Sequence, residues 1–237
     1  MTAAGSRVFC AIDTTDLETA RRLATQLRGA VGGLKLGLEF FAAHGPEGVR
    51  RVIGESGLPL FLDLKVHDIP NTAAGAVRAA VGLGPAFLTV HASGGLAMMQ
   101  AAAETATNEA ARLGRPRPKL LGVTVLTSLT DRELHSVGQA IPVADQVARL
   151  AALAEEAGLD GVVCSPHEIT LVRAKARPGF TIMVPGIRPA TSVLGDQKRV
   201  MTPAQAMAAG ADYLVIGRPI TQEKDPAAAA KKIAAEL

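Results

Sequence analysis

Short apolar runs alternate with longer helical patterns along the whole chain, and this alternation constrains the fold more than any other feature. The apolar runs predict eight strands, at residues 8–12, 34–37, 60–65, 87–90, 120–125, 161–164, 181–184 and 213–216. The intervening patterns predict helices, at residues 16–28, 39–55, 70–81, 96–113, 144–157, 166–175, 203–208 and from 226 onward. Nearly continuous apolar strands are typical of a parallel sheet covered by helices, so eight such units predict a closed (β/α)8 barrel, the TIM-barrel architecture.

A doubly wound open sheet is the alternative fold for alternating strands and helices. Dinucleotide-binding sheets of that type carry a G-x-G-x-x-G pattern directly after the first strand. Here the first predicted strand is followed by Asp13-Thr14-Thr15, without that pattern. Since no linker, low-complexity segment or block of charge divides the chain, we expect residues 1–237 to form a single barrel domain that is catalytic.

The end of the third predicted strand carries charge in an otherwise apolar segment. Side chains alternate between the two faces of a strand, so Asp63 and Lys65 point the same way. Placing two opposite charges in one interior costs several kcal/mol unless they are paired or used. Asp68 adds a second acid just past the strand. This pattern favours a functional site, with a structural ion-pair layer inside the barrel as the alternative.

Two neighbouring strands deliver further charges to the same rim. Asp13 ends the first predicted strand, and Lys35 lies in the second. Active sites of (β/α)8 barrels lie at the carboxyl ends of the strands, where these side chains would meet Asp63 and Lys65. An alternating cluster of this kind satisfies its own charges and holds an ammonium group in a fixed place. The alternative is again a structural ion-pair layer.

The end of the chain supplies a candidate anion site. Gly186 and Arg188 follow the seventh predicted strand, and Gly217 and Arg218 follow the eighth. Loops after these two strands commonly bind phosphate in this fold, and an arginine can bind it with two hydrogen bonds. A surface ion pair is the alternative interpretation of the Gly217-Arg218 dipeptide, whose place after the eighth strand favours phosphate. The segment at residues 189–200 is long and rich in small and polar residues, which predicts a closing lid.

Composition excludes several classes of partner. The net charge is only +3, with scattered lysines and arginines, one Tyr, six Phe and no Trp. Because stacking platforms for bases are scarce, we expect no nucleic acid partner and favour a small anionic ligand. The first residues lack the pattern of a signal peptide, and no apolar run approaches the ~20 residues of a membrane span. We therefore expect a cytoplasmic protein without membrane contact, in which Cys10 and Cys164 are buried, reduced thiols.

Motifs spread over the chain resemble those of the orotidine 5'-phosphate decarboxylase family. The most specific is the D-x-K-x-x-D pattern with its H-D-I-P-N-T tail, within residues 61–72. The other matching motifs are Ile12-Asp13, Leu34-Lys35-Leu36-Gly37, Val90-His91-Ala92, Leu126-Thr127-Ser128, Pro185-Gly186-Ile187-Arg188, Gly195-Asp196-Gln197 and Ile216-Gly217-Arg218. The resemblance implies a carbon–carbon lyase that converts orotidine 5'-phosphate to UMP and CO2, the last step of de novo pyrimidine biosynthesis.

The resemblance also implies roles for individual residues. Lys65 would donate the proton to C6 of the pyrimidine, flanked by Asp63, and Lys35 would complete the charged network. Asp68 would serve the site of a neighbouring subunit, which implies a homodimer with shared active sites. The resemblance gives the remaining roles as follows: Ile69 and Thr72 accompany Asp68 across the interface, Asp13 and Lys35 hold the ribose hydroxyls, Thr127 or Ser128 contacts the base, and Arg188, Gln197, Gly217 and Arg218 contact the phosphate end.

We expect the reaction to need no cofactor and no metal. No Schiff-base or thiamine motif is present, and no His, Cys and carboxylate cluster has the spacing of metal ligands. The nearest rival is 3-keto-L-gulonate 6-phosphate decarboxylase, which is similar in fold and in D-x-K-x-x-D. That enzyme relies on Mg²⁺ and has an acidic residue at the position of Lys35, where a lysine repels the cation. A non-catalytic nucleotide-binding barrel is a further alternative, which measured turnover would exclude.

Overall fold

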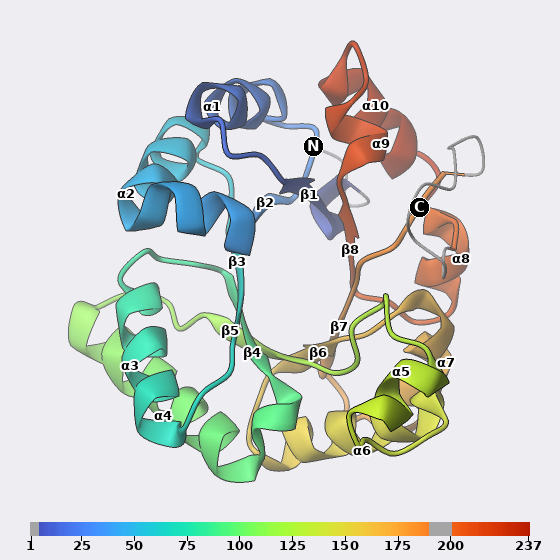
Figure 1. Ribbon diagram of the computed structural model, residues 1–237. Coiled ribbons are helices and arrows are strands. Elements are labelled where there is room, and N and C mark those ends of the chain that lie inside the picture. Colours follow the sequence, from blue (N-terminus) through green and yellow to red (C-terminus); the bar gives the residue numbers. More distant parts are fainter. Residues whose placement is uncertain (1–4, 190–200) are drawn as a thin grey trace.

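The chain forms a closed barrel of eight parallel strands in sequential order, encircled by helices (Figure 1). The computed structural model describes residues 5–189 and 201–237. The strands are β1 (Val8–Ile12), β2 (Gly33–Gly37), β3 (Leu60–Val66), β4 (Phe87–His91), β5 (Lys119–Val123), β6 (Gly161–Val163), β7 (Thr181–Val184) and β8 (Tyr213–Ile216). Pairing of β1 with β8 closes the sheet, which confirms the (β/α)8 barrel and excludes the open sheet.

The helices lie where the sequence predicts them, with additions and one kink. They are α1 (Leu17–Gln26), α2 (Leu38–Ser56), α3 (Pro70–Val81), α4 (Leu96–Leu113), α5 (Asp131–Ser136), α6 (Val143–Glu156), α7 (Ile169–Lys175), α8 (Pro203–Ala208), α9 (Arg218–Thr221) and α10 (Pro226–Ala234). Helix α9 is an addition that the sequence pattern does not predict, whereas α5 contains His135, which lies in a polar stretch that the sequence predicts to be helical. The sequence predicts a continuous helix over residues 39–55, whereas Gly45, with φ of 58°, kinks α2 before Pro46.

The strand residues divide between an outer and an inner packing layer. On β3, Leu62 is fully buried in the main core against the helices, whereas Phe61 points to the barrel axis. Phe61 meets Phe9 and Phe87 inside the barrel, and Tyr213 packs against the same two rings. The ring centroids of Phe9 and Phe87 lie 5.3 Å apart, edge to face. This aromatic floor fills the barrel below the carboxyl ends of its strands.

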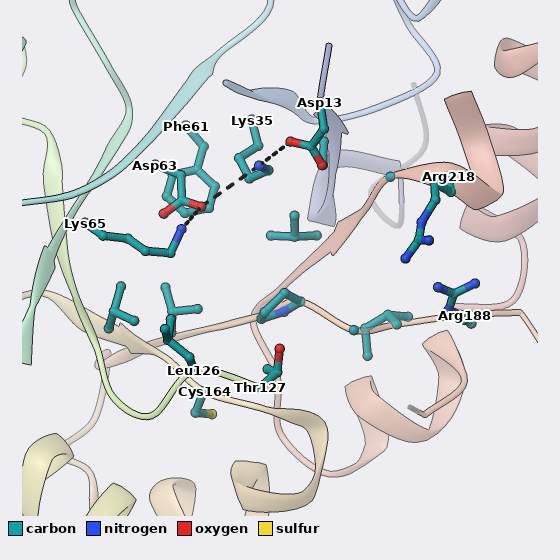
Figure 2. A pocket seen from close by; sticks show the side chains of 18 of the residues that line it. Asp13, Lys35, Phe61, Asp63, Lys65, Leu126, Thr127, Cys164, Arg188 and Arg218 are labelled. Carbon is teal, nitrogen blue, oxygen red and sulfur yellow. Dashed lines mark hydrogen bonds and ion pairs between the residues drawn. The ribbon is translucent and has the colours of Figure 1, made fainter. Parts of the chain in front are cut away.

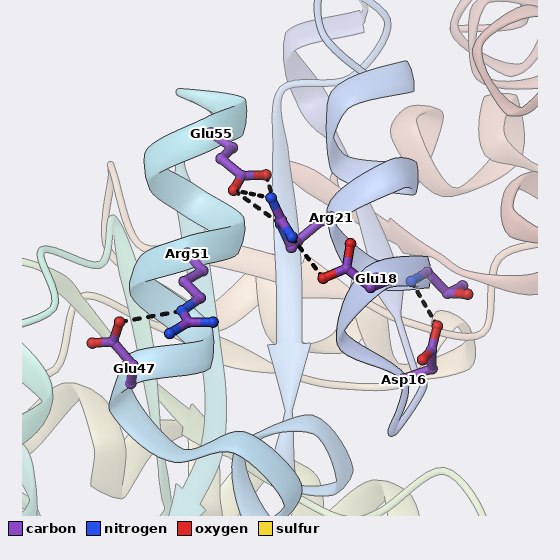
Figure 3. Close-up of polar contacts among 7 residues, drawn as sticks. Asp16, Glu18, Arg21, Glu47, Arg51 and Glu55 are labelled. Carbon is purple, nitrogen blue, oxygen red and sulfur yellow. Dashed lines mark hydrogen bonds and ion pairs between the residues drawn. The ribbon is translucent and has the colours of Figure 1, made fainter.

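Helices α1 and α2 are joined by polar contacts on the outside of the barrel (Figure 3). The Arg21 guanidinium lies 2.6 Å from a carboxylate oxygen of Glu18 and 2.6 Å from one of Glu55. Asp16 caps α1 by accepting a hydrogen bond of 2.7 Å from the Thr19 N–H. Each exposed ion pair stabilises by at most about 1 kcal/mol, so burial of the apolar helix faces dominates the packing here.

Candidate active site

The carboxyl ends of the strands surround a cavity of about 250 Å³ (Figure 2). Polar side chains on β2 and β3, and directly after β1, β5, β7 and β8, line this cavity. They are Asp13, Lys35, Asp63, Lys65, Thr127, Arg188 and Arg218. The sequence predicts all of these as site residues, and the fold brings them to one pocket because parallel strands end at the same rim.

The acidic and basic groups at one end of the cavity form an alternating row. The Lys35 ammonium lies 2.8 Å from Asp13 Oδ1 and 4.0 Å from Asp63 Oδ2. The same Asp63 oxygen accepts a hydrogen bond of 2.7 Å from Lys65 Nζ. Asp63 is only 8% exposed, so its charge is held by these two ammonium groups rather than by water. The row Asp13–Lys35–Asp63–Lys65, called the ionic row below, ends at the amine of Lys65.

The strand that carries Asp63 and Lys65 is irregular. Its register with β4 runs from Leu62 opposite Leu88 to Val66 opposite Val90, so residues 63–65 face the single residue between Leu88 and Val90. Lys65 has φ of 50°, the only residue other than glycine with positive φ in the described part of the chain. Such a conformation is uncommon for a residue with a side chain and persists where the surroundings hold it.

Two arginines lie at the opposite end of the cavity from Lys65, as Figure 2 shows. Arg188 follows β7 and is 8% exposed, and its backbone N–H donates to the Met201 carbonyl at 3.0 Å. Arg218 follows Gly217 after β8. A pair of guanidinium groups suits an anion with several oxygens, such as phosphate. Gln197 and nearly all of the expected lid lie outside the described residues.

Apolar side chains also line the cavity, and the sequence predicts none of them as site residues. They include Phe61, Val125, Leu126, Cys164 and Ile187. In the sequence, Phe61, Val125 and Cys164 are indistinguishable from ordinary core residues, because they lie in apolar predicted strands. Burial raises the pKa of the Cys164 thiol well above its ordinary value, so it lines the pocket as an inert, neutral group. Thr127 lies beside these residues, whereas Ser128 is exposed and does not line the cavity.

The residues expected to serve a neighbouring subunit lie outside the cavity of their own chain. Asp68 is exposed, and its Oδ1 accepts a hydrogen bond of 2.7 Å from the Ile69 N–H. Ile69 is 67% exposed, although it is a large apolar residue. Thr72 is exposed in the first turn of α3. The structure therefore separates these three residues from Asp63 and Lys65.

Two histidines lie near the ionic row without lining the cavity. The rings of His67 and His91 stack with centroids 5.3 Å apart, and Ser93 Oγ lies 2.8 Å from His91 Nδ1. Burial and the charges of His67 and Lys65 lower the pKa of His91. Among the described residues no group of three or more His, Cys, Asp or Glu side chains could hold a metal ion. In the same part of the chain, no helix combines the length and the apolar character that crossing a membrane requires.

The fold and the charged pocket define an enzyme of the (β/α)8-barrel class, with its polar groups at the carboxyl ends of the strands. The chain belongs to the orotidine 5'-phosphate decarboxylase / HUMPS family, whose sequence model matches residues 6–233.

Individual relatives are similar over nearly their whole length. The chain is 58% identical to the orotidine 5'-phosphate decarboxylase of Rhodospirillum rubrum over 230 residues, which cover 97% of this chain and 93% of the relative. It is 56% identical to that of Paramagnetospirillum magneticum, with 97% of each chain covered. A crystal structure of orotidine 5'-phosphate decarboxylase from Lactobacillus acidophilus has a TM-score of 0.85 at 36% identity, covering 97% of both chains.

Proposed function

We propose that this protein decarboxylates orotidine 5'-phosphate to UMP and CO2, as the last step of de novo pyrimidine biosynthesis. The observation that carries the proposal is the Lys65 ammonium, hydrogen-bonded to buried Asp63 at 2.7 Å at one end of the cavity. Family membership over residues 6–233 supports the same substrate and reaction. The cytoplasmic location expected from the sequence stays a prediction.

The cavity offers a distinct place for each part of this substrate. Arg188 and Arg218 would bind the phosphate, together with Gly217 and Gln197. Asp13 and Lys35, which are already paired at 2.8 Å, would hold the ribose hydroxyls. The pyrimidine would lie against the apolar side chains of the cavity, next to Thr127, with C6 toward Lys65. Binding at the distant phosphate would then hold the ring in register for the reaction.

The chemistry follows from the charges in the ionic row. The bond between C6 and its carboxylate breaks, CO2 leaves, and the electron pair stays on C6. The Lys65 ammonium stabilises this developing negative charge and then gives its proton to C6, which forms UMP. The resulting amine regains a proton from water. Asp63 would face the substrate carboxylate, and their repulsion ends when neutral CO2 departs.

The position of Lys35 argues against the Mg²⁺-dependent rival. Its ammonium lies 2.8 Å from Asp13 and 4.0 Å from Asp63, which is where a divalent cation bound by these carboxylates would have to lie. The Lys35 ammonium would repel a Mg²⁺ ion that entered this space, and the ion would gain no further ligands to offset that repulsion. We therefore propose that the reaction uses neither metal nor cofactor.

We also propose that the active protein is a homodimer in which Asp68 reaches the site of the partner subunit, with Ile69 and Thr72 at the interface. The exposure of all three residues at the start of α3 supports this arrangement. Ile69 is 67% exposed, so a partner subunit that covers it would bury apolar surface. Asp68 would add a second carboxylate near Lys65 and complete the charged network.

The decisive test is turnover of orotidine 5'-phosphate, followed by loss of the orotate absorbance in the presence of EDTA. We expect full activity with the chelator and no measurable turnover for Lys65→Ala, with an unchanged circular dichroism spectrum. Lys119→Ala is the matched control, because this lysine lies at the opposite end of the barrel, at the start of β5. Failure of the wild-type protein to consume the substrate, or near-native turnover by Lys65→Ala, would refute the proposal.

A further inference from the structure

The irregular pairing of β3 with β4 places one buried hydroxyl against both charged residues of β3. Residues 63–65 face Thr89 alone, because the register shifts between Leu62 and Val66. Thr89 is fully buried. Its Oγ1 lies 2.9 Å from the Lys65 backbone nitrogen and 2.9 Å from Asp63 Oδ1. No part of the sequence pattern marks this threonine, which is an ordinary residue for a strand.

The directions of these two hydrogen bonds are fixed by chemistry. A backbone N–H can only donate, so the Thr89 oxygen accepts from Lys65. The single hydroxyl proton is then free to be donated to the Asp63 carboxylate, which accepts. The other carboxylate oxygen, Oδ2, accepts from Lys65 Nζ at 2.7 Å. Thr89, Asp63 and Lys65 therefore form a closed ring of three hydrogen bonds.

We propose that Thr89 is a positioning residue that holds the Lys65 amine and the Asp63 carboxylate in reactive geometry, an inference that rests on the decarboxylation proposed above. Its contact with the Lys65 N–H holds the backbone in its uncommon conformation, with φ of 50°. Its contact with Asp63 Oδ1 orients the carboxylate so that Oδ2 faces the amine. Thr89 does not line the cavity, so it acts through these two residues.

Removal of the hydroxyl affects the chemical step more than binding. In Thr89→Val the volume is retained, but the Lys65 N–H and Asp63 Oδ1 both lose a buried partner. The backbone of residues 63–65 can then relax toward a commoner conformation, which moves the Lys65 amine away from C6. The arginines at the far end of the cavity are untouched, so substrate affinity remains.

The experiment compares Thr89→Val with Thr89→Ser, which keeps the hydroxyl, and with Thr181→Val. Thr181 is a matched control because it is also buried, but it begins β7 at the opposite end of the barrel. We expect kcat of Thr89→Val to fall by at least about tenfold, equivalent to about 1.4 kcal/mol, with KM and inhibition by UMP changed by less than about twofold. Thr89→Ser and Thr181→Val should keep kcat within about threefold of wild type.

A second readout does not depend on catalysis. Amide hydrogen exchange at Lys65, followed by NMR, should become faster in Thr89→Val and stay slow in Thr89→Ser. If Thr89→Val does not fold, Thr89→Ala carries the same expectations. Native kcat and slow exchange without the hydroxyl, or an equal loss of kcat in Thr89→Ser, would overturn the role of Thr89. An inactive wild-type protein would instead overturn the proposed function. The amide exchange rates of the Thr89 variants would still test whether Thr89 holds the backbone of Lys65.

Discussion

Replacement of Lys35 by methionine tests whether the ionic row works as a unit. Methionine keeps an unbranched side chain but removes the ammonium that lies 2.8 Å from Asp13 and 4.0 Å from Asp63. At 4.0 Å, with an effective dielectric constant of about 20, the attraction between Lys35 and Asp63 is about 4 kcal/mol before desolvation. Asp63 retains Lys65 as a partner at 2.7 Å, and Asp13 is half exposed, so water and Lys65 recover part of this energy.

We estimate a net loss of about 2 kcal/mol, typical of a hydrogen bond to a charged group, which corresponds to a roughly 30-fold fall in kcat/KM. The assay is the loss of orotate absorbance at low substrate concentration. Arg21→Met is the matched control, because Arg21 also bridges two carboxylates but lies on the outer helices (Figure 3). A Lys35→Met protein with kcat/KM within about twofold of wild type, or an equal fall in Arg21→Met, would refute the reasoning.

Two further predictions concern the partner subunit and the thiols. Mixing Lys65→Ala with Asp68→Ala, each inactive alone, should restore about a quarter of wild-type activity, because half of the dimers are hybrids with one intact site. A mixture that stays inactive although the subunits exchange would contradict the shared site. Burial raises the pKa of Cys10 to about 12 and raises that of Cys164 further. Iodoacetamide at pH 8 should therefore modify neither thiol in the native protein and both in urea, and rapid native labelling would contradict this.

The parts of the site that the sequence reveals are those with a strong periodic or chemical signal. Alternation on a strand places Asp63 and Lys65 on one side, and the structure brings them within 2.7 Å. The short helix α5 also carries a start signal in the sequence. Thr130 and Glu133 form a capping box, with the T-x-x-E spacing that marks a helix start.

Other features leave no signal in the sequence. Lysine is not a residue that predicts positive φ, so the conformation of Lys65 depends on the shifted register of β3 and on contacts with another strand. Thr89 lies 24 residues away from Lys65 in the chain, and a strand threonine has many structural uses. Within the apolar lining, Val125 differs from other buried core residues only by its place at the barrel mouth. Each of these properties arises from tertiary contacts rather than from local pattern.

The aromatic floor and the ionic row depend on each other. Phe61 belongs to both regions, because its ring lines the cavity and lies 6.1 Å from the ring of Phe87 in the barrel interior. Asp63 follows two residues later on the same face of β3, directly above this apolar cluster. Since the floor keeps the dielectric low, the field of the Lys65 ammonium at the reacting carbon is stronger than in water. The same low dielectric makes an unpaired charge costly. The ammonium groups of the ionic row therefore require neighbouring carboxylates. Catalysis therefore depends both on the apolar packing below the ionic row and on the alternating charges along it. Replacing Phe61 by a polar residue should weaken catalysis, although no charged group is changed.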